Sequence, residues 1–211
     1  MSSKKRPRRK AFRAPAWLKV TVLAGVAVSL GLFILSRQAS PSTQPTASSD
    51  APALPSVGSK APDGVFTTIS GKTVSVASLR GKPTLLWFVT TWCSSCQAST
   101  ETLAQNLSAL GRDGVRVAEV ELYDDLGTQG PTLQSFGQQY AGAAFRSPNW
   151  TWGVASEAMS QTYDPVGYLD IYYLLDAQGM IRYINSAPVE TMPQIRNAVS
   201  QLSRGASPTS P

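Results

Sequence analysis

Residues 84–96 read TLLWFVTTWCSSC, and the fold prediction starts from this stretch. Its first seven residues are apolar or β-branched and follow the turn-forming Gly-Lys-Pro of residues 81–83, which predicts a short strand buried on both faces. After the second cysteine, Leu103, Leu107 and Leu110 recur at helical spacing. The two cysteines are therefore expected where a buried strand passes into a helix.

Similar patterns predict further elements on both sides of this stretch. We expect a β-hairpin at 65–69 and 73–76, a strand at 115–122, a core strand containing Trp150 and Trp152, and a second hairpin at 171–175 and 180–184. Helices are expected around Leu133, Phe136 and Tyr140, and around Ile195, Val199 and Leu202. Strand–helix–strand units pair in parallel and a late hairpin adds an antiparallel edge. The prediction is an α/β fold with a mixed sheet, an N-terminal β-hairpin and flanking helices.

The chain divides by composition into five parts. We predict a basic cytoplasmic arm at 1–16, a transmembrane anchor at 17–36, a disordered linker at 37–58, the folded domain at 59–204 and a disordered tail at 205–211. The 20 residues of 17–36 are almost wholly apolar, and as a helix they would span about 30 Å, the thickness of a bilayer core. A cleaved signal peptide is the alternative for this segment.

Charge is distributed unevenly along the chain. Nine of the 19 Lys and Arg residues lie within residues 1–37, which contain no Asp or Glu, so the remainder carries ten basic and 13 acidic side chains. Basic residues before a membrane span favour a cytoplasmic N-terminus and an extracytoplasmic domain. A mildly acidic domain argues against nucleic-acid binding, and topology explains the basic arm without it.

The 211 residues contain two cysteines and no histidine. No Ser–His or Cys–His nucleophile can therefore be built, and a zinc or copper site of the usual Cys/His type is excluded. We expect no metal and no cofactor. The remaining chemistry belongs to Cys93 and Cys96.

Cys93 and Cys96 are two residues apart, at the predicted start of a helix. Unpaired N–H groups and the helix dipole stabilise an anion there, so Cys93 is expected to be the thiolate nucleophile and Cys96 the resolving thiol. Ser94 and Ser95 can add hydroxyl donors to the thiolate, and Trp92 can shield the pair. A structural disulfide is the alternative, although such a small loop constrains the unfolded chain little.

Three segments carry a resemblance to a known family: residues 70–82, the Trp-Cys-Ser-Ser-Cys of 92–96, and residues 173–181. In these the domain resembles the thioredoxin-like superfamily, and within it the membrane-anchored TlpA/ResA-like thiol–disulfide oxidoreductases and the redoxins. The resemblance implies a thioredoxin-like fold and disulfide exchange with the thiols or disulfides of exported proteins. It also implies re-reduction by a membrane electron donor of thiol type, and hence a reductase.

The chain departs from this family at three places. The dipeptide between the cysteines usually contains proline and is Ser94-Ser95 here. The family's cis-proline falls on Leu169 or Asp170, so we expect a trans peptide there. The family's buried acids fall on Trp87 and Ser99. Asp170 is then either a replacement acid, acting on the cysteines by charge or as a base for Cys96, or an ordinary loop residue.

Two other functions are compatible with the sequence. A peroxiredoxin-like peroxidase needs a threonine three residues before its cysteine, which Thr90 provides, but Leu86 stands where those enzymes have proline. A non-catalytic thioredoxin-like binding module is the other alternative, in which the altered docking loop has lost turnover.

Overall fold

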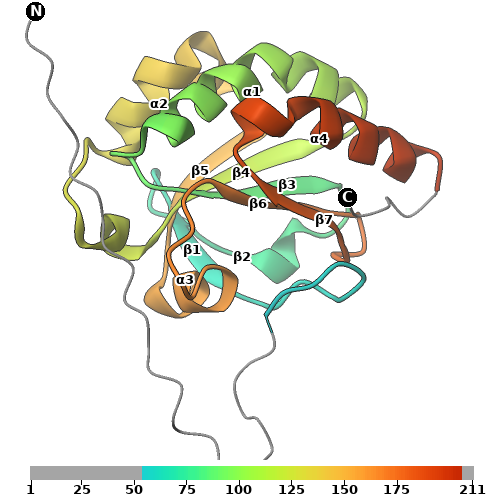
Figure 1. Cartoon of the computed structure of the whole chain (residues 1–211), viewed down its shortest axis with the longest axis horizontal. Coiled ribbons are helices and arrows are strands. Elements are labelled where there is room, and N and C mark those ends of the chain that lie inside the picture. The colour runs from blue at the N-terminus through green and yellow to red at the C-terminus, as the bar shows by residue number, and fades with distance from the viewer. Residues whose placement is uncertain (1–53, 206–211) are drawn as a thin grey trace, which may run out of the picture. The chain divides into compact units, whose positions relative to one another are not determined.

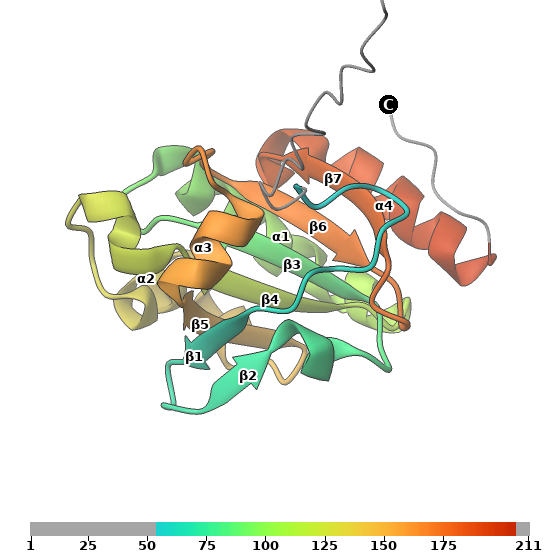
Figure 2. The ribbon, with the colours of Figure 1, turned by 90° about the horizontal axis from the view of Figure 1, so that it is seen from below.

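Seven strands form one mixed sheet in the computed structural model, which describes residues 54–205. The strand order is β2-β1-β5-β4-β3-β6-β7, and Figure 2 shows the sheet from the β2 edge to the β7 edge. The strands are β1 Val65–Thr68, β2 Thr73–Ser75, β3 Thr84–Val89, β4 Arg116–Glu121, β5 Trp150–Ala155, β6 Ile171–Leu175 and β7 Ile181–Ser186. The central strands β3, β4 and β5 are parallel, whereas both predicted hairpins pair antiparallel. The predicted mixed sheet is confirmed.

Four α-helices cover the sheet on its two faces (Figure 1). Helices α1 Ser94–Arg112, α2 Leu133–Ala141 and α4 Pro188–Ser203 lie on one face, and α3 Glu157–Tyr163 lies on the other. Short 3-10 helices span Val76–Leu79, Tyr123–Gly127 and Gly142–Arg146. Helix α3 was not predicted from the sequence, because its seven residues include only two buried apolar side chains, Met159 and Tyr163, which are too few to show a helical period.

Each face of the sheet has its own apolar core. Strand β3 contributes to both, since Leu85, Trp87 and Val89 face the α1 side while Leu86 and Phe88 face α3. All six of its residues are buried, as predicted for a strand covered on both faces. Trp150 and Trp152 are buried on β5 with ring centroids 4.7 Å apart, which confirms the predicted core strand.

The predicted arm and transmembrane anchor, and most of the linker and tail, lie outside the described residues. Within residues 54–205, none of the helices combines the length and apolarity needed to span a bilayer. The last linker residues contact the domain, because Gly58 N donates to Ile181 O at 2.8 Å.

Candidate active site

Cys93 and Cys96 lie where β3 passes into α1, as the sequence predicts. Cys93 is the N-cap residue of α1, and its Sγ accepts a hydrogen bond from the Cys96 amide at 3.2 Å. The Ser95 hydroxyl lies 3.0 Å from the same sulfur. Both cysteines are free thiols, with Cys93 4% and Cys96 0% exposed. Ser94 is exposed and its hydroxyl makes no hydrogen bond with the described residues, so only one of the two predicted hydroxyl donors reaches the sulfur.

The surroundings of the two thiols shift their pKa values in opposite directions. Hydrogen bonding from the Cys96 side chain, supported by Ser95 and the backbone amides, lowers the pKa of Cys93 to about 5 against the effect of burial. The same interaction with Cys93, together with burial and the charge of Asp170, raises the pKa of Cys96 well above its ordinary value. At neutral pH the pair therefore carries one thiolate, on Cys93, and one thiol, on Cys96.

Asp170 lies in the interior, immediately before β6. It is 1% exposed, and its carboxylate accepts from Trp87 Nε1 at 2.8 Å and from Ser99 Oγ at 2.9 Å. Burial raises the pKa of Asp170 to about 6, although both hydrogen bonds oppose the shift. The ordinary-loop alternative is wrong, because the carboxylate is enclosed and interacts electrostatically with both cysteines.

Trp87 and Ser99 stand at the two positions where this chain lacks a buried acid. These are the two places where the resembling family carries its buried acids, and here both side chains donate hydrogen bonds to Asp170 instead. The carboxylate that contacts these two side chains comes from the loop before β6, whereas Trp87 lies within β3 and Ser99 within α1. Every peptide bond among the described residues is trans, so the loop at Leu169 and Asp170 is trans as predicted. Leu169 is half-buried against the core that contains both cysteines.

A clamp that the sequence analysis missed holds the two residues before Cys93. The Asp125 carboxylate accepts from Thr91 N at 2.8 Å and Thr91 Oγ1 at 2.6 Å, and the Asp125 carbonyl accepts from Trp92 Nε1 at 2.8 Å. Asp124, Asp125 and Leu126 all have positive φ, an unusual conformation for three successive residues other than glycine. Trp92 is half-buried and packs on the core around the cysteines, so it lies where a side chain that shields the pair is expected.

Glu119 is a second buried acid that the sequence analysis missed. It lies opposite Trp87 on β4, fully buried, and its Oε1 is 3.1 Å from Thr100 Oγ1. That hydroxyl also donates to the Cys96 carbonyl at 2.8 Å. Burial raises the pKa of Glu119 well above its ordinary value. The only available signal was a carboxylate among apolar residues in a predicted strand.

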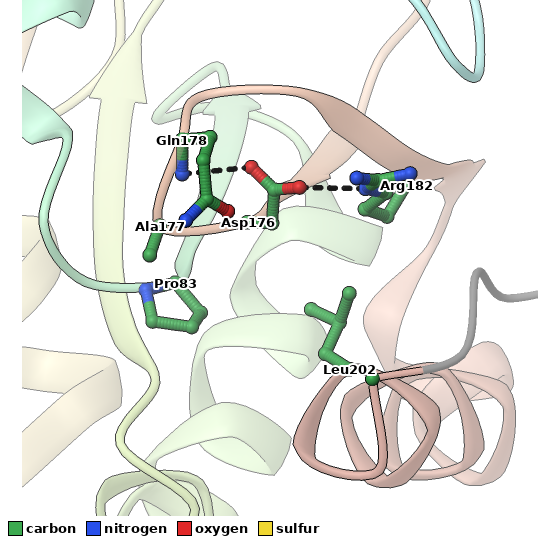
Figure 3. Close-up of a pocket in the computed structure, with 7 residues that line it drawn as sticks. Pro83, Asp176, Ala177, Gln178, Arg182 and Leu202 are labelled. Carbon is green, nitrogen blue, oxygen red and sulfur yellow. Dashed lines mark hydrogen bonds and ion pairs between the residues drawn. The ribbon is translucent and has the colours of Figure 1, made fainter.

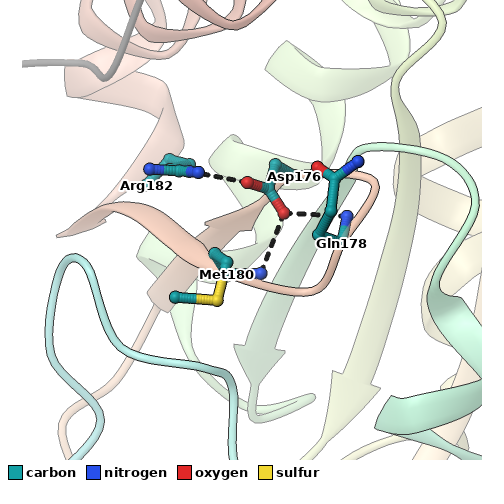
Figure 4. A network of polar contacts seen from close by, with 4 residues as sticks. All are labelled: Asp176, Gln178, Met180 and Arg182. Atoms are coloured by element: carbon teal, nitrogen blue, oxygen red, sulfur yellow. Dashed lines mark hydrogen bonds and ion pairs between the residues drawn. The ribbon is translucent and has the colours of Figure 1, made fainter.

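A separate hollow lies at the other end of the sheet, beside the start of β3 (Figure 3). Pro83, Gln178 and Leu202 are among its lining residues. Asp176 accepts from the amides of Gln178 and Met180 at 2.9 Å and from Arg182 Nε at 2.6 Å (Figure 4). These contacts close the β6–β7 turn. Six residues of β3 separate this hollow from the cysteines, about 20 Å of strand.

Comparison with solved structures defines the class of fold as thioredoxin-like. A thiol:disulfide interchange protein DsbE, described as putative, from Chlorobium tepidum is 22% identical, with a TM-score of 0.52 over 70% of this chain and 99% of that chain. An electron transfer protein from Aquifex aeolicus, described likewise, is 19% identical, with a TM-score of 0.54 over 71% of this chain and 99% of its own. Residues 57–184 match the AhpC/TSA family, so the chain belongs to that family.

Two curated relatives share part of this sequence. The soluble secreted antigen MPT53 of Mycobacterium tuberculosis is 38% identical over 74 residues, which are 35% of this chain and 39% of that protein. The thiol:disulfide interchange protein DsbE of Yersinia pestis is 32% identical over 123 residues, 54% of each chain. The chain thus matches between two fifths and about half of the length of these relatives.

Proposed function

We propose that this protein is a thiol–disulfide oxidoreductase in which Cys93 and Cys96 form the redox pair. The observation that carries the proposal is the division of charge between the two thiols. Cys93 is a stabilised thiolate at a helix N-terminus, and Cys96 is a shielded thiol one turn further on. This is the arrangement that a nucleophile and a resolving group require. The match to DsbE of Yersinia pestis supports the same activity.

The reaction proceeds in two exchanges. The Cys93 thiolate attacks one sulfur of a substrate disulfide, the substrate S–S bond breaks, and one substrate sulfur leaves as a thiolate that takes a proton from water. Cys96 then loses its proton and attacks Cys93 Sγ, which releases the second substrate sulfur. The substrate gains two electrons, and the cysteine pair loses them as it forms its own disulfide.

We assign Asp170 as the acceptor of the proton that Cys96 loses. The strongest cause of the raised pKa of Cys96 is its hydrogen bond with Cys93. In the mixed disulfide the Cys93 sulfur is no longer a thiolate, so this cause disappears and the pKa of Cys96 falls. Asp170, with a pKa of about 6, is then a carboxylate at pH 7 and accepts the proton.

The setting of the reaction comes from the sequence and is part of the proposal. The basic arm and apolar segment at 1–36 support a single-pass membrane protein of TlpA/ResA type, with an extracytoplasmic domain. Its partners would be exported proteins with thiols or disulfides, and a membrane electron donor of thiol type would re-reduce the pair. The direction that we propose is reduction of substrate disulfides.

A redox titration tests the proposal. The full chain, purified in non-ionic detergent, would be equilibrated with glutathione or dithiothreitol buffers while Trp fluorescence is followed. A reversible two-electron couple near or below about −220 mV supports a reductase, and one near about −120 to −180 mV supports an oxidant or isomerase. Cys93→Ser should abolish exchange, whereas Cys96→Ser should accumulate the mixed disulfide. A pair that does not cycle reversibly overturns the proposal in favour of a binding module.

A peroxidase is the second candidate, because the chain belongs to the AhpC/TSA family. Thr90 is fully buried, and its hydroxyl has no hydrogen-bond partner among the described residues. Consumption of hydrogen peroxide by the reduced full chain distinguishes the two functions. Turnover that requires Cys93 and exceeds the rate of disulfide reduction would favour the peroxidase.

A further inference from the structure

Four chain segments surround the cysteine pair. Residues 88–100 carry the cysteines, and Asp125 ties residues 121–130 to Thr91 and Trp92. Asp170 ties residues 163–170 to α1, and Val189 N donates to Ser99 Oγ at 3.1 Å, which adds residues 186–193. A Cβ added to Gly167 would lie 3.5 Å from Leu126, so the second and third segments lie close to each other. We call these four segments the cysteine face.

The charges of the cysteine face have a single sign. Its four segments contain no Lys or Arg, and their six acids are Glu121, Asp124, Asp125, Asp164, Asp170 and Glu190. Asp124 and Glu190 are exposed, while the others are partly or fully buried. Acids whose field is not compensated by neighbouring cations produce a negative potential where a substrate approaches.

The same face exposes apolar side chains. Val166 is 69% and Tyr168 is 66% exposed, and Leu126 and Tyr123 are also exposed. An apolar surface with an acidic rim suits the side chains of Lys and Arg, because their aliphatic stems pack on apolar atoms while their charged ends reach carboxylates. An acidic substrate would meet the same apolar surface but would be repelled by the rim.

We propose that the cysteine face selects cationic substrates, namely polypeptide segments with Lys or Arg beside the reacting cysteine. The inference rests on the proposed function, since it names the substrate class of the same cysteine pair. The negative field steers the cation toward Cys93, which raises the rate of the first exchange. The chemistry is unchanged: the substrate disulfide gains two electrons and the cysteine pair loses them.

Three small disulfides of different charge provide the test. The reduced full chain in non-ionic detergent would be reacted at pH 8 with cystamine (cationic), hydroxyethyl disulfide (neutral) and dithiodipropionate (anionic). At this pH the carboxyls of Glu121 and Asp170, whose pKa values burial raises to about 7 and about 6, are ionised. Each rate is divided by the rate of the same probe with dithiothreitol, which removes differences in leaving group.

The expected order is cystamine, then hydroxyethyl disulfide, then dithiodipropionate. The normalised rates of the two charged probes should differ by about tenfold or more near 0.01 M salt. This difference should largely vanish near about 1 M salt, where screening extends over only about 3 Å. Asp124→Asn should slow cystamine and speed dithiodipropionate by about twofold each, the effect of one unit charge at about 10 Å in water, and so reduce the ratio of their rates by about fourfold. Glu190→Gln should act in the same direction. Asp113→Asn, exposed beyond the far end of α1, is the matched control and should leave the ratio unchanged.

The outcomes separate the inference from the proposed function. If all three probes are reduced at similar normalised rates, or if the preference survives high salt and both substitutions on the cysteine face, the inference is wrong and the proposed function stands. If no probe is reduced, the proposed function fails and the inference fails with it.

Discussion

Replacing Asp170 by asparagine tests the buried carboxylate by its effect on stability. The pKa of this carboxyl rises from 3.8 to about 6 in the folded protein, chiefly because of burial. The folded state therefore binds the proton more tightly than the unfolded state. Stability from this group is complete below about pH 4 and is lost as the pH rises through 6. A shift of about two units costs the folded protein about 3 kcal/mol at pH 7.

Asparagine cannot ionise, so Asp170→Asn removes that cost. Its Oδ1 can still accept from Trp87, but its amide N–H replaces the oxygen that accepts from Ser99, which loses about 1 kcal/mol. At pH 7 the variant should be more stable than the parent by about 2 kcal/mol. At pH 4, where ionisation costs the parent only about 0.5 kcal/mol, the variant should be less stable by about 0.5 kcal/mol.

Urea unfolding of the reduced full chain at pH 4 and pH 7, followed by Trp fluorescence, measures both values. Asp113→Asn makes the same change of carboxyl to amide at an exposed position, so it should shift stability by less than about 0.5 kcal/mol at either pH. An equal change in the free energy of unfolding at both pH values for Asp170→Asn would refute the reasoning. The same variant should accumulate mixed disulfide, because Cys96 loses the assigned proton acceptor.

Three further predictions concern the residues around Cys93. Alkylation of Cys93 by iodoacetamide should reach half of its maximal rate near pH 5, where the thiolate forms, and should then rise to a plateau that holds to about pH 8. A midpoint near pH 9 would contradict this prediction. Ser95→Ala should move this midpoint upward, because the hydroxyl 3.0 Å from the sulfur is lost, whereas Ser94→Ala at the exposed neighbour should not. Gly130→Ala should destabilise the chain by about 1–3 kcal/mol in urea unfolding, because a Cβ there would collide with Thr91 Oγ1 and break the Asp125 clamp; unchanged stability would exclude a tight clamp.

The sequence predicted the parts of this protein that depend on residues close together in the chain. A buried strand, a helix with leucines at i, i+4 and i+7, and two hairpins are local patterns, and the structure contains all of them. The position of Cys93 at a helix N-terminus is also local, because the strand ends and the helix begins within the same short stretch. These features identified the fold class and the candidate thiols.

The positions of the acids around the thiols were determined only by the tertiary structure. Asp170 is 83 residues from Trp87 and 71 from Ser99, and Asp125 is 34 residues from Thr91. Periodicity distinguishes buried from exposed positions, but a polar residue beside a turn looks the same whether it faces water or a cysteine. The sequence showed that this chain has no acid at Trp87 and Ser99, the two positions where the resembling family carries buried acids. Where the replacement carboxylate lies, and that one acidic face surrounds the pair, follows from folding distant segments together.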